Sequence, residues 1–215
     1  MYKQAYERGD VEIIGPIMRL QVQPTSIKVK RGREQYEPGT LQRVETLRVD
    51  ARGVVGVTKS GEQIMDIHHR DYPHSHYRRG NSLSLCFTSH YRRLQSLFGP
   101  HLFDGSAGEN LLVQTDRSYS FEEVEAGFAL YHRATGRWSE FGAVRVATPC
   151  EPFARYALNK RLLPVPAAQM KATLQELDHG RRGFYVTVVV ERGQPVTIQT
   201  GDLLLRRCHA PYVVE

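Results

Sequence analysis

The chain has 215 residues, of which 40% are hydrophobic and 24% charged, so it supports an ordinary globular core and excludes wholesale disorder. No stretch approaches the roughly 20 consecutive apolar residues of a membrane helix, and the polar start of the sequence lacks the apolar core of a signal peptide. We therefore expect a cytoplasmic protein with no membrane contact. The formal net charge of +6 favours anionic partners.

The first quarter of the chain predicts strands separated by turns. Residues 11–23 alternate loosely and are rich in Ile, Val and Leu, which indicates an opening strand. A basic segment, 28–33, follows, and residues 37–40 are typical of a turn. Further strands are expected at 41–49 and, between two glycines, at 53–57.

The rest of the chain mixes short strands with two clear helices. A strand at 81–87 leads into a helix that Thr88 or Ser89 caps and that runs to about Phe98, with an apolar stripe formed by Tyr91, Leu94, Leu97 and Phe98. A second helix is expected at 167–179. Strands are expected at 111–113, 127–132, 142–147, 184–190, 196–199 and 202–205. Many short strands with few helices predict a mainly β protein, a barrel or a sandwich.

The three cysteines are Cys86, Cys150 and Cys208, and their odd number and wide spacing do not fit a secreted disulfide framework. Cys150 lies between Pro149 and Pro152, in a rigid bend. A helix that begins at the following residue would place its positive end by the thiol and favour the thiolate, which sulfur transfer or molybdenum ligation requires. Cys86 lies in an apolar strand and is expected in the core, whereas Cys208 lies in the tail and is interpreted as incidental. Burial is the common fate of a free cysteine, so simple packing is the alternative for each.

Asp66, His68 and His69 are followed by two more histidines within nine residues, which suggests either a metal site or a polar loop at the edge of a pocket. Adjacent histidines of a strand point to opposite faces. One site would not readily use both His68 and His69, so the pocket loop is favoured.

Two glycine-containing segments could approach a ligand closely. Residues 105–111 place Gly108, Glu109 and Asn110 at the entry of a strand, without the ending of a nucleotide P-loop. Arg182 beside Gly183 offers a compact anion contact. Each segment alone is equally compatible with a structural turn.

Taken in order, these segments resemble the MOSC domain, named for the C-terminal domain of molybdenum cofactor sulfurase. The matching residues are Asp66-Ile67-His68-His69, Ser106-Ala107-Gly108-Glu109-Asn110-Leu111, Pro149-Cys150, Arg182-Gly183-Phe184-Tyr185 and Gly201-Asp202. The resemblance covers about residues 50–205. It implies one β-barrel domain spanning 1–215, with strands from 11–49 packed on that core.

The resemblance also implies chemistry at Cys150, which would carry sulfur or ligate the molybdenum of a molybdopterin cofactor. His68 and His69 would be catalytic with it. The residues expected to bind the cofactor are Asp66, Gly108, Glu109, Asn110, Arg182, Gly183 and Tyr185. The protein would be a sulfurtransferase or a molybdenum-dependent oxidoreductase acting on small N-oxygenated compounds, and a separate protein would donate sulfur or electrons.

Some positions depart from the family pattern. Arg70-Asp71 stands where glycines usually follow the double histidine, Ser106 replaces a glycine, and residues 119–138 look unlike the family. Two other classes therefore stay open. One is a non-catalytic barrel that acts as a binding or scaffold module, and the other is a nucleic-acid-binding barrel, suggested by the charge and the basic segment 28–33.

Overall fold

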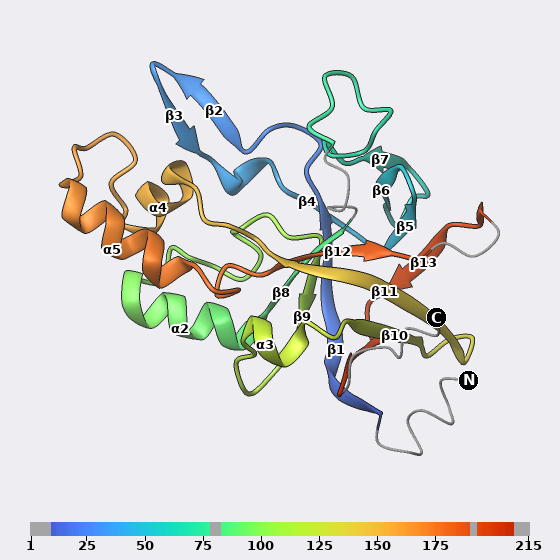
Figure 1. Ribbon diagram of the computed structural model, residues 1–215. Coiled ribbons are helices and arrows are strands. Elements are labelled where there is room, and N and C mark those ends of the chain that lie inside the picture. Colours follow the sequence, from blue (N-terminus) through green and yellow to red (C-terminus); the bar gives the residue numbers. More distant parts are fainter. Residues whose placement is uncertain (1–9, 78–82, 190–192, 209–215) are drawn as a thin grey trace, which may run out of the picture.

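A closed barrel of seven strands forms the centre of the molecule (Figure 1). The computed structural model describes residues 10–77, 83–189 and 193–208. The strands, in their order around the barrel, are β1 (Val11–Val22), β9 (Leu111–Val113), β8 (Leu83–Phe87), β12 (Phe184–Val188), β11 (Arg137–Val146), β10 (Phe128–His132) and β14 (Leu203–Arg207). All neighbours are antiparallel except β8 and β9, and β14 pairs with β1 to close the ring. The predicted mainly β barrel is confirmed.

The long strand β1 is one of the barrel strands and joins the two ends of the chain. Its first half pairs with β14, from Val11 opposite Arg207 to Pro16 opposite Leu203, and its second half pairs with β9 and β4 (Gln42–Val44). The register shifts between Ile13 and Gly15 and again further along, as in β-bulges. A bulged strand bends, and the bend lets β1 pair with β14 along its first half and with β9 and β4 along its second half.

A second sheet of four strands packs against the barrel. It is made of β13 (Val196–Gln199), β5 (Thr46–Asp50), β6 (Gly53–Val57) and β7 (Gln63–Met65). The strand expected at 41–49 is in fact two strands, β4 and β5, divided at Glu45. They are separate because β4 pairs with β1 of the barrel, whereas β5 pairs with β6 and β13 of the second sheet.

Three helices gather on the side of the barrel away from this sheet (Figure 1). They are α2 (Thr88–Phe98), α4 (Glu151–Ala157) and α5 (Ala167–Leu177); α3 (Phe121–Val124) and a 3-10 turn, η1 (Pro38–Thr40), are shorter. In α2, Tyr91 and Leu94 are buried as predicted, but Leu97 is 49% exposed, so the apolar stripe is narrower than its spacing indicated. No helix in the described ranges is long and apolar enough to span a membrane.

The basic segment forms a hairpin that the sequence did not reveal. Strands β2 (Lys28–Arg31) and β3 (Arg33–Tyr36) turn at Gly32, whose φ of 74° suits glycine. The fully buried ring of Tyr36 anchors the base of the hairpin, since its centroid lies 5.0 Å from that of Phe153 and 5.4 Å from that of Tyr156, both in α4.

The Gly201-Asp202 segment of the predicted motif set has a structural place at the start of β14. One Asp202 carboxylate oxygen accepts the backbone N–H of Arg133 and the other that of Gln199. His132 bridges this carboxylate to Ser139, with 3.2 Å from Nδ1 to Asp202 Oδ2 and 2.8 Å from Nε2 to Ser139 Oγ. These bonds tie β10, β11 and β14 together at the barrel seam.

His90, buried at the start of α2 between the rings of Phe87 and Phe184, predicts acid sensitivity. Burial lowers its pKa from 6.5 to about 4. The unfolded chain therefore binds the proton first, and stability present above pH 6.5 is lost as pH falls toward 4. We expect the free energy of unfolding, measured with urea, to fall by up to about 3 kcal/mol across this window. His90→Gln retains an acceptor for the N–H of Tyr119. In this variant the free energy of unfolding should no longer fall by this amount between pH 6.5 and 4. An unchanged slope in the variant would contradict the assignment.

Candidate functional site

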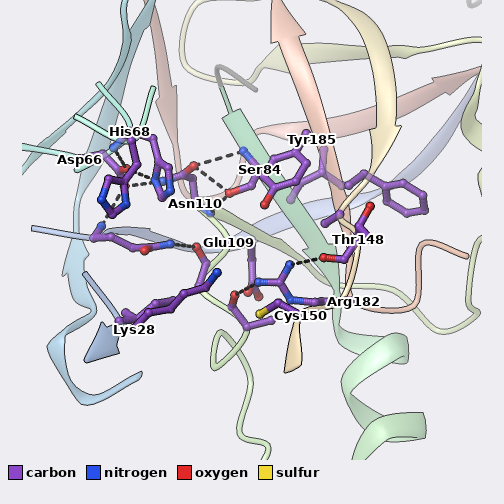
Figure 2. Close-up of a pocket in the computed structure, with 18 of the residues that line it drawn as sticks. Lys28, Asp66, His68, Ser84, Glu109, Asn110, Thr148, Cys150, Arg182 and Tyr185 are labelled. Carbon is purple, nitrogen blue, oxygen red and sulfur yellow. Dashed lines mark hydrogen bonds and ion pairs between the residues drawn. The ribbon is translucent and has the colours of Figure 1, made fainter. Parts of the chain in front are cut away.

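A cavity of about 1160 Å³ opens where β8 and β12 begin and β11 ends, beside the hairpin (Figure 2). Pockets that hold small molecules and cofactors commonly span about 300 to 1,000 Å³. Its lining brings together residues of four of the five motifs. The lining side chains that carry polar chemistry are Gln23, Ser26, Lys28, Glu34, Tyr36, Asp66, His68, His76, Tyr77, Ser84, Glu109, Asn110, Arg145, Thr148, Cys150, Arg182 and Tyr185.

Cys150 lines this cavity as the residue that immediately precedes α4. The helix begins at Glu151, which meets the condition set for a thiol beside the helix N-terminus, and Pro152 occupies its first turn. The side chain is half-buried and packs against the apolar cluster beneath the helices. Cys86, by contrast, is fully buried, and burial raises the pKa of its thiol well above its ordinary value. Only the first of these two thiols faces a space that could hold a ligand.

Arg182 lies next to Cys150, and its guanidinium is already held by the protein (Figure 2). Nη1 donates to the carbonyl of Thr148 and Nη2 to that of Ala107, both at 3.3 Å, and the guanidinium carbon lies 5.0 Å from the ring centroid of Phe153. Burial would lower the pKa of Arg182, but nearby Tyr36, Tyr185 and Cys150 raise it, so it stays charged. Arg182 therefore places a fixed positive charge beside the thiol.

Glu109 is a buried carboxyl in the same cavity. Its Oε2 accepts a 2.8 Å hydrogen bond from the Tyr91 hydroxyl, which in turn accepts the backbone N–H of Ala107. Its Oε1 meets no hydrogen-bond partner within the part of the chain that the structure describes. Burial raises the pKa of Glu109 to about 7, although Tyr91 and the charges of Arg182 and Arg19 act in the opposite direction.

Asp66 and His68 form a hydrogen-bonded pair at the edge of the cavity. The buried Asp66 accepts from His68 twice: its Oδ1 lies 2.9 Å from the backbone nitrogen and 2.8 Å from Nδ1. Its Oδ2 accepts from the backbone N–H of Gln23 and the amide of Asn110. With Nδ1 held in this way, Nε2 of the half-exposed His68 is the nitrogen available to a ligand.

His69 does not join this pair. It is buried against Gly53 on the far side of the loop, where Nδ1 accepts the backbone N–H of Asp71 and Nε2 lies 3.9 Å from Asp50. It is absent from the cavity lining. The side chains of His68 and His69 point to different sides, as expected, but the two residues lie in a turn rather than in a strand. Among the residues that the structure describes, no three His, Cys, Asp or Glu side chains lie together as a metal site would require.

The other predicted binding residues serve the framework. Asn110 uses its whole side-chain amide internally, since Oδ1 accepts from Ser84 and Nδ2 donates to Gln21 and Asp66. A Cβ at Gly108 would lie 2.7 Å from a methyl of Ile27, and one at Gly183 would lie 2.5 Å from the carbonyl oxygen of Leu85. Close packing therefore requires both glycines. Gly108 lines the cavity whereas Gly183 does not; Tyr185 lines it from β12.

Several lining residues carry no local signal in the sequence. Lys28, Glu34 and Tyr36 come from the hairpin, and Arg145 and Thr148 come from β11 and the loop after it. The basic segment 28–33 stands out in the sequence only by its charge. Nothing local in residues 137–148 marks a cavity wall, because that role depends on how β11 pairs with β12.

Comparisons with models of protein families and with curated proteins give no match. Among solved structures, the chain is similar to the YuaD protein from Bacillus subtilis, with a TM-score of 0.54, 13% identity and coverage of 93% of this chain and 98% of that one. A hypothetical protein matches with a TM-score of 0.51, 14% identity and coverage of 94% and 71%. YiiM from Escherichia coli matches with a TM-score of 0.43, 16% identity and coverage of 78% and 65%. At such identities the first two likenesses concern the fold alone. They agree with the mainly β barrel predicted from the sequence.

The burial of Glu109 predicts a stability cost at alkaline pH. The carboxyl ionises at about pH 7 in the folded chain but near 4.5 when unfolded, so the folded state holds its proton longer and stability falls as pH rises from 4.5 to 7. We expect Glu109→Gln, which can still accept from Tyr91, to be more stable than the wild type at pH 8 by up to about 3 kcal/mol. The gap should close near pH 4.5. Urea unfolding at the two pH values measures it, and a gap independent of pH would contradict the burial of an ionisable carboxyl.

Proposed function

We propose that this protein binds a molybdopterin-type cofactor, or carries sulfur, at the cavity that contains Cys150. The observation that carries the proposal is the convergence of four segments far apart in the sequence on one space. These segments contribute Asp66 with His68, Glu109 with Asn110, Cys150, and Arg182 with Tyr185. A cysteine whose thiol only packs in the core would not need polar and charged side chains from four segments around it.

The chemistry of the cavity fits a cofactor of this kind. A soft thiolate is a ligand that molybdenum accepts, and Cys150 has a permanent positive charge beside it in Arg182. Buried polar atoms also await partners, since Glu109 Oε1 and Arg182 Nε have none among the described residues. Buried groups of this kind are usually satisfied by protein, water or ligand. A pterin ring, which carries many hydrogen-bond donors and acceptors, could form hydrogen bonds with these buried polar atoms.

Distinct roles follow for the lining residues. Cys150 would hold the metal or the transferred sulfur, and His68, oriented by Asp66, would accept or donate a proton at Nε2. Tyr185 and the main chain around Gly108 would form the walls. When bound, the molybdenum centre would supply two-electron redox chemistry toward a small N-oxygenated compound, with electrons from a separate donor protein.

Sulfur transfer is the second candidate, and the same thiol favours it. A thiolate at Cys150 attacks the outer sulfur of a persulfide on a donor protein, and the donor leaves as a thiolate. Arg182 would offset the negative charge of both the thiolate and the persulfide. The two candidates differ in whether the metal and pterin stay with the chain.

The proposal predicts that the cofactor depends on one cysteine. We would express the chain in a host that makes molybdenum cofactor and measure molybdenum and pterin per purified chain. Near-stoichiometric metal in the wild type, lost in Cys150→Ser, is the result expected of a cofactor-bearing enzyme.

Cys208→Ser is the matched control, because Cys208 lies in the tail and outside the cavity lining. It should retain the wild-type content. Metal and pterin absent from every chain, together with a persulfide on Cys150 after treatment with a persulfide donor, would select the sulfur carrier. A wild-type chain that holds neither the metal and pterin nor a persulfide on Cys150 would contradict the proposal.

A further inference from the structure

We propose that Lys28 and Arg145 form an anion subsite in the cavity, which binds the phosphate group of a ligand. This inference rests on the proposed function in using the same cavity, but it assigns a subsite to two residues outside the motifs. Both side chains line the cavity, Lys28 from the hairpin and Arg145 from β11.

The side chains of these two cations are less engaged than that of Arg182. Arg182 donates from Nη1 and Nη2 to the carbonyls of Thr148 and Ala107 and lies over the ring of Phe153, so that Nε alone of its nitrogens has no partner among the described residues. Neither Lys28 nor Arg145 makes a side-chain hydrogen bond or ion pair with any residue that the structure describes. An incoming anion would therefore displace no partner within residues 10–77, 83–189 and 193–208. The phosphate contact that the sequence suggested for Arg182 fits these two residues better.

The balance of charge in the cavity supports an anion. Asp66 is buried and accepts four hydrogen bonds, which offset its charge, and burial keeps Glu109 largely protonated below its pKa of about 7. Glu34 is the remaining acidic group among the lining residues. It lies opposite Lys30 in the hairpin, where a cation and an anion on the same face attract each other. Lys28 and Arg145, together with Arg182, therefore give the cavity lining more positive than negative charge.

The hairpin holds Lys28 in place. Lys28 lies directly opposite Tyr36, whose buried ring packs on Phe153 and Tyr156 of α4. The helix that follows Cys150 and the strand that carries Lys28 therefore belong to one packed unit. Figure 2 shows the Lys28 side chain extending from the hairpin into the cavity. Phosphate bound there would lie on the hairpin side of the thiol.

Binding of inorganic phosphate to the cofactor-free chain tests the subsite. Line broadening of the phosphorus resonance gives the affinity, and Lys28→Ala and Arg145→Ala should each weaken it about tenfold or more, since a charge-assisted hydrogen bond is lost. Arg33→Ala is the matched control: Arg33 is an exposed cation in the same hairpin but lies outside the cavity lining. Its affinity should stay within about twofold of the wild type.

The same variants, expressed in the host that makes molybdenum cofactor, identify the source of the phosphate. Loss of molybdenum and pterin in Lys28→Ala and Arg145→Ala, but not in Arg33→Ala, assigns the subsite to the cofactor phosphate. Full cofactor content with lost phosphate binding assigns it to a phosphorylated substrate. Phosphate binding without cofactor in any chain supports the subsite while the proposed function fails. A wild type that does not bind phosphate, or cavity variants that behave as Arg33→Ala does, would overturn the inference.

Discussion

The buried carboxylate of Asp66 holds the candidate site together. Its two oxygens accept four hydrogen bonds, from the main chain at Gln23, from the side chain of Asn110, and from His68 twice. These donors belong to the end of β1, the entry of β9 and the loop after β7. A buried carboxylate is costly unless such donors surround it. One interaction thus fixes the rim of the cavity and selects the His68 nitrogen that faces a ligand.

Arg182 and Glu109, in contrast to Asp66, do not have all of their hydrogen bonds satisfied within the part of the protein that the structure describes. Arg182 and Glu109 are buried with parts of their hydrogen-bonding capacity unused, and the pKa of Glu109 is raised to about 7 by that burial. Functional sites commonly hold such perturbed groups, because a fold selected for stability alone would replace or satisfy them. Asp66 is therefore part of the framework, whereas Glu109 and Arg182 keep capacity that a ligand could use. The distinction is visible only in the hydrogen bonds, since all three positions belong to the same set of motifs.

Local patterns in the sequence predicted the elements that depend on local signals. The strand at 53–57 has the bounds of β6. The helix expected after the strand at 81–87 is α2, but the prediction that Thr88 or Ser89 caps it was wrong, since Phe87 is the N-cap and no side chain caps the helix. A helix that starts at Glu151, the condition set for a favoured thiolate, is present as α4. The hairpin was missed because residues 28–36 lack apolar alternation, and its stability comes from Tyr36 packing on a helix more than 100 residues away. The separation of His68 from His69 was predicted, yet nothing in the sequence told which of the two would face the cavity. That choice is made by the partners, Asp66 for one and Asp71 with Gly53 for the other.

We infer that Cys150 is the thiol of a ligand-binding cavity, whereas Cys86 is a thiol of the core. The rate at which a small neutral alkylating reagent modifies each cysteine of the native chain, followed by mass spectrometry, tests this inference. We expect Cys150 to react in the folded protein, whereas Cys86, with no exposed surface, should react only after unfolding. A native chain in which Cys150 is as inert as Cys86 would contradict it.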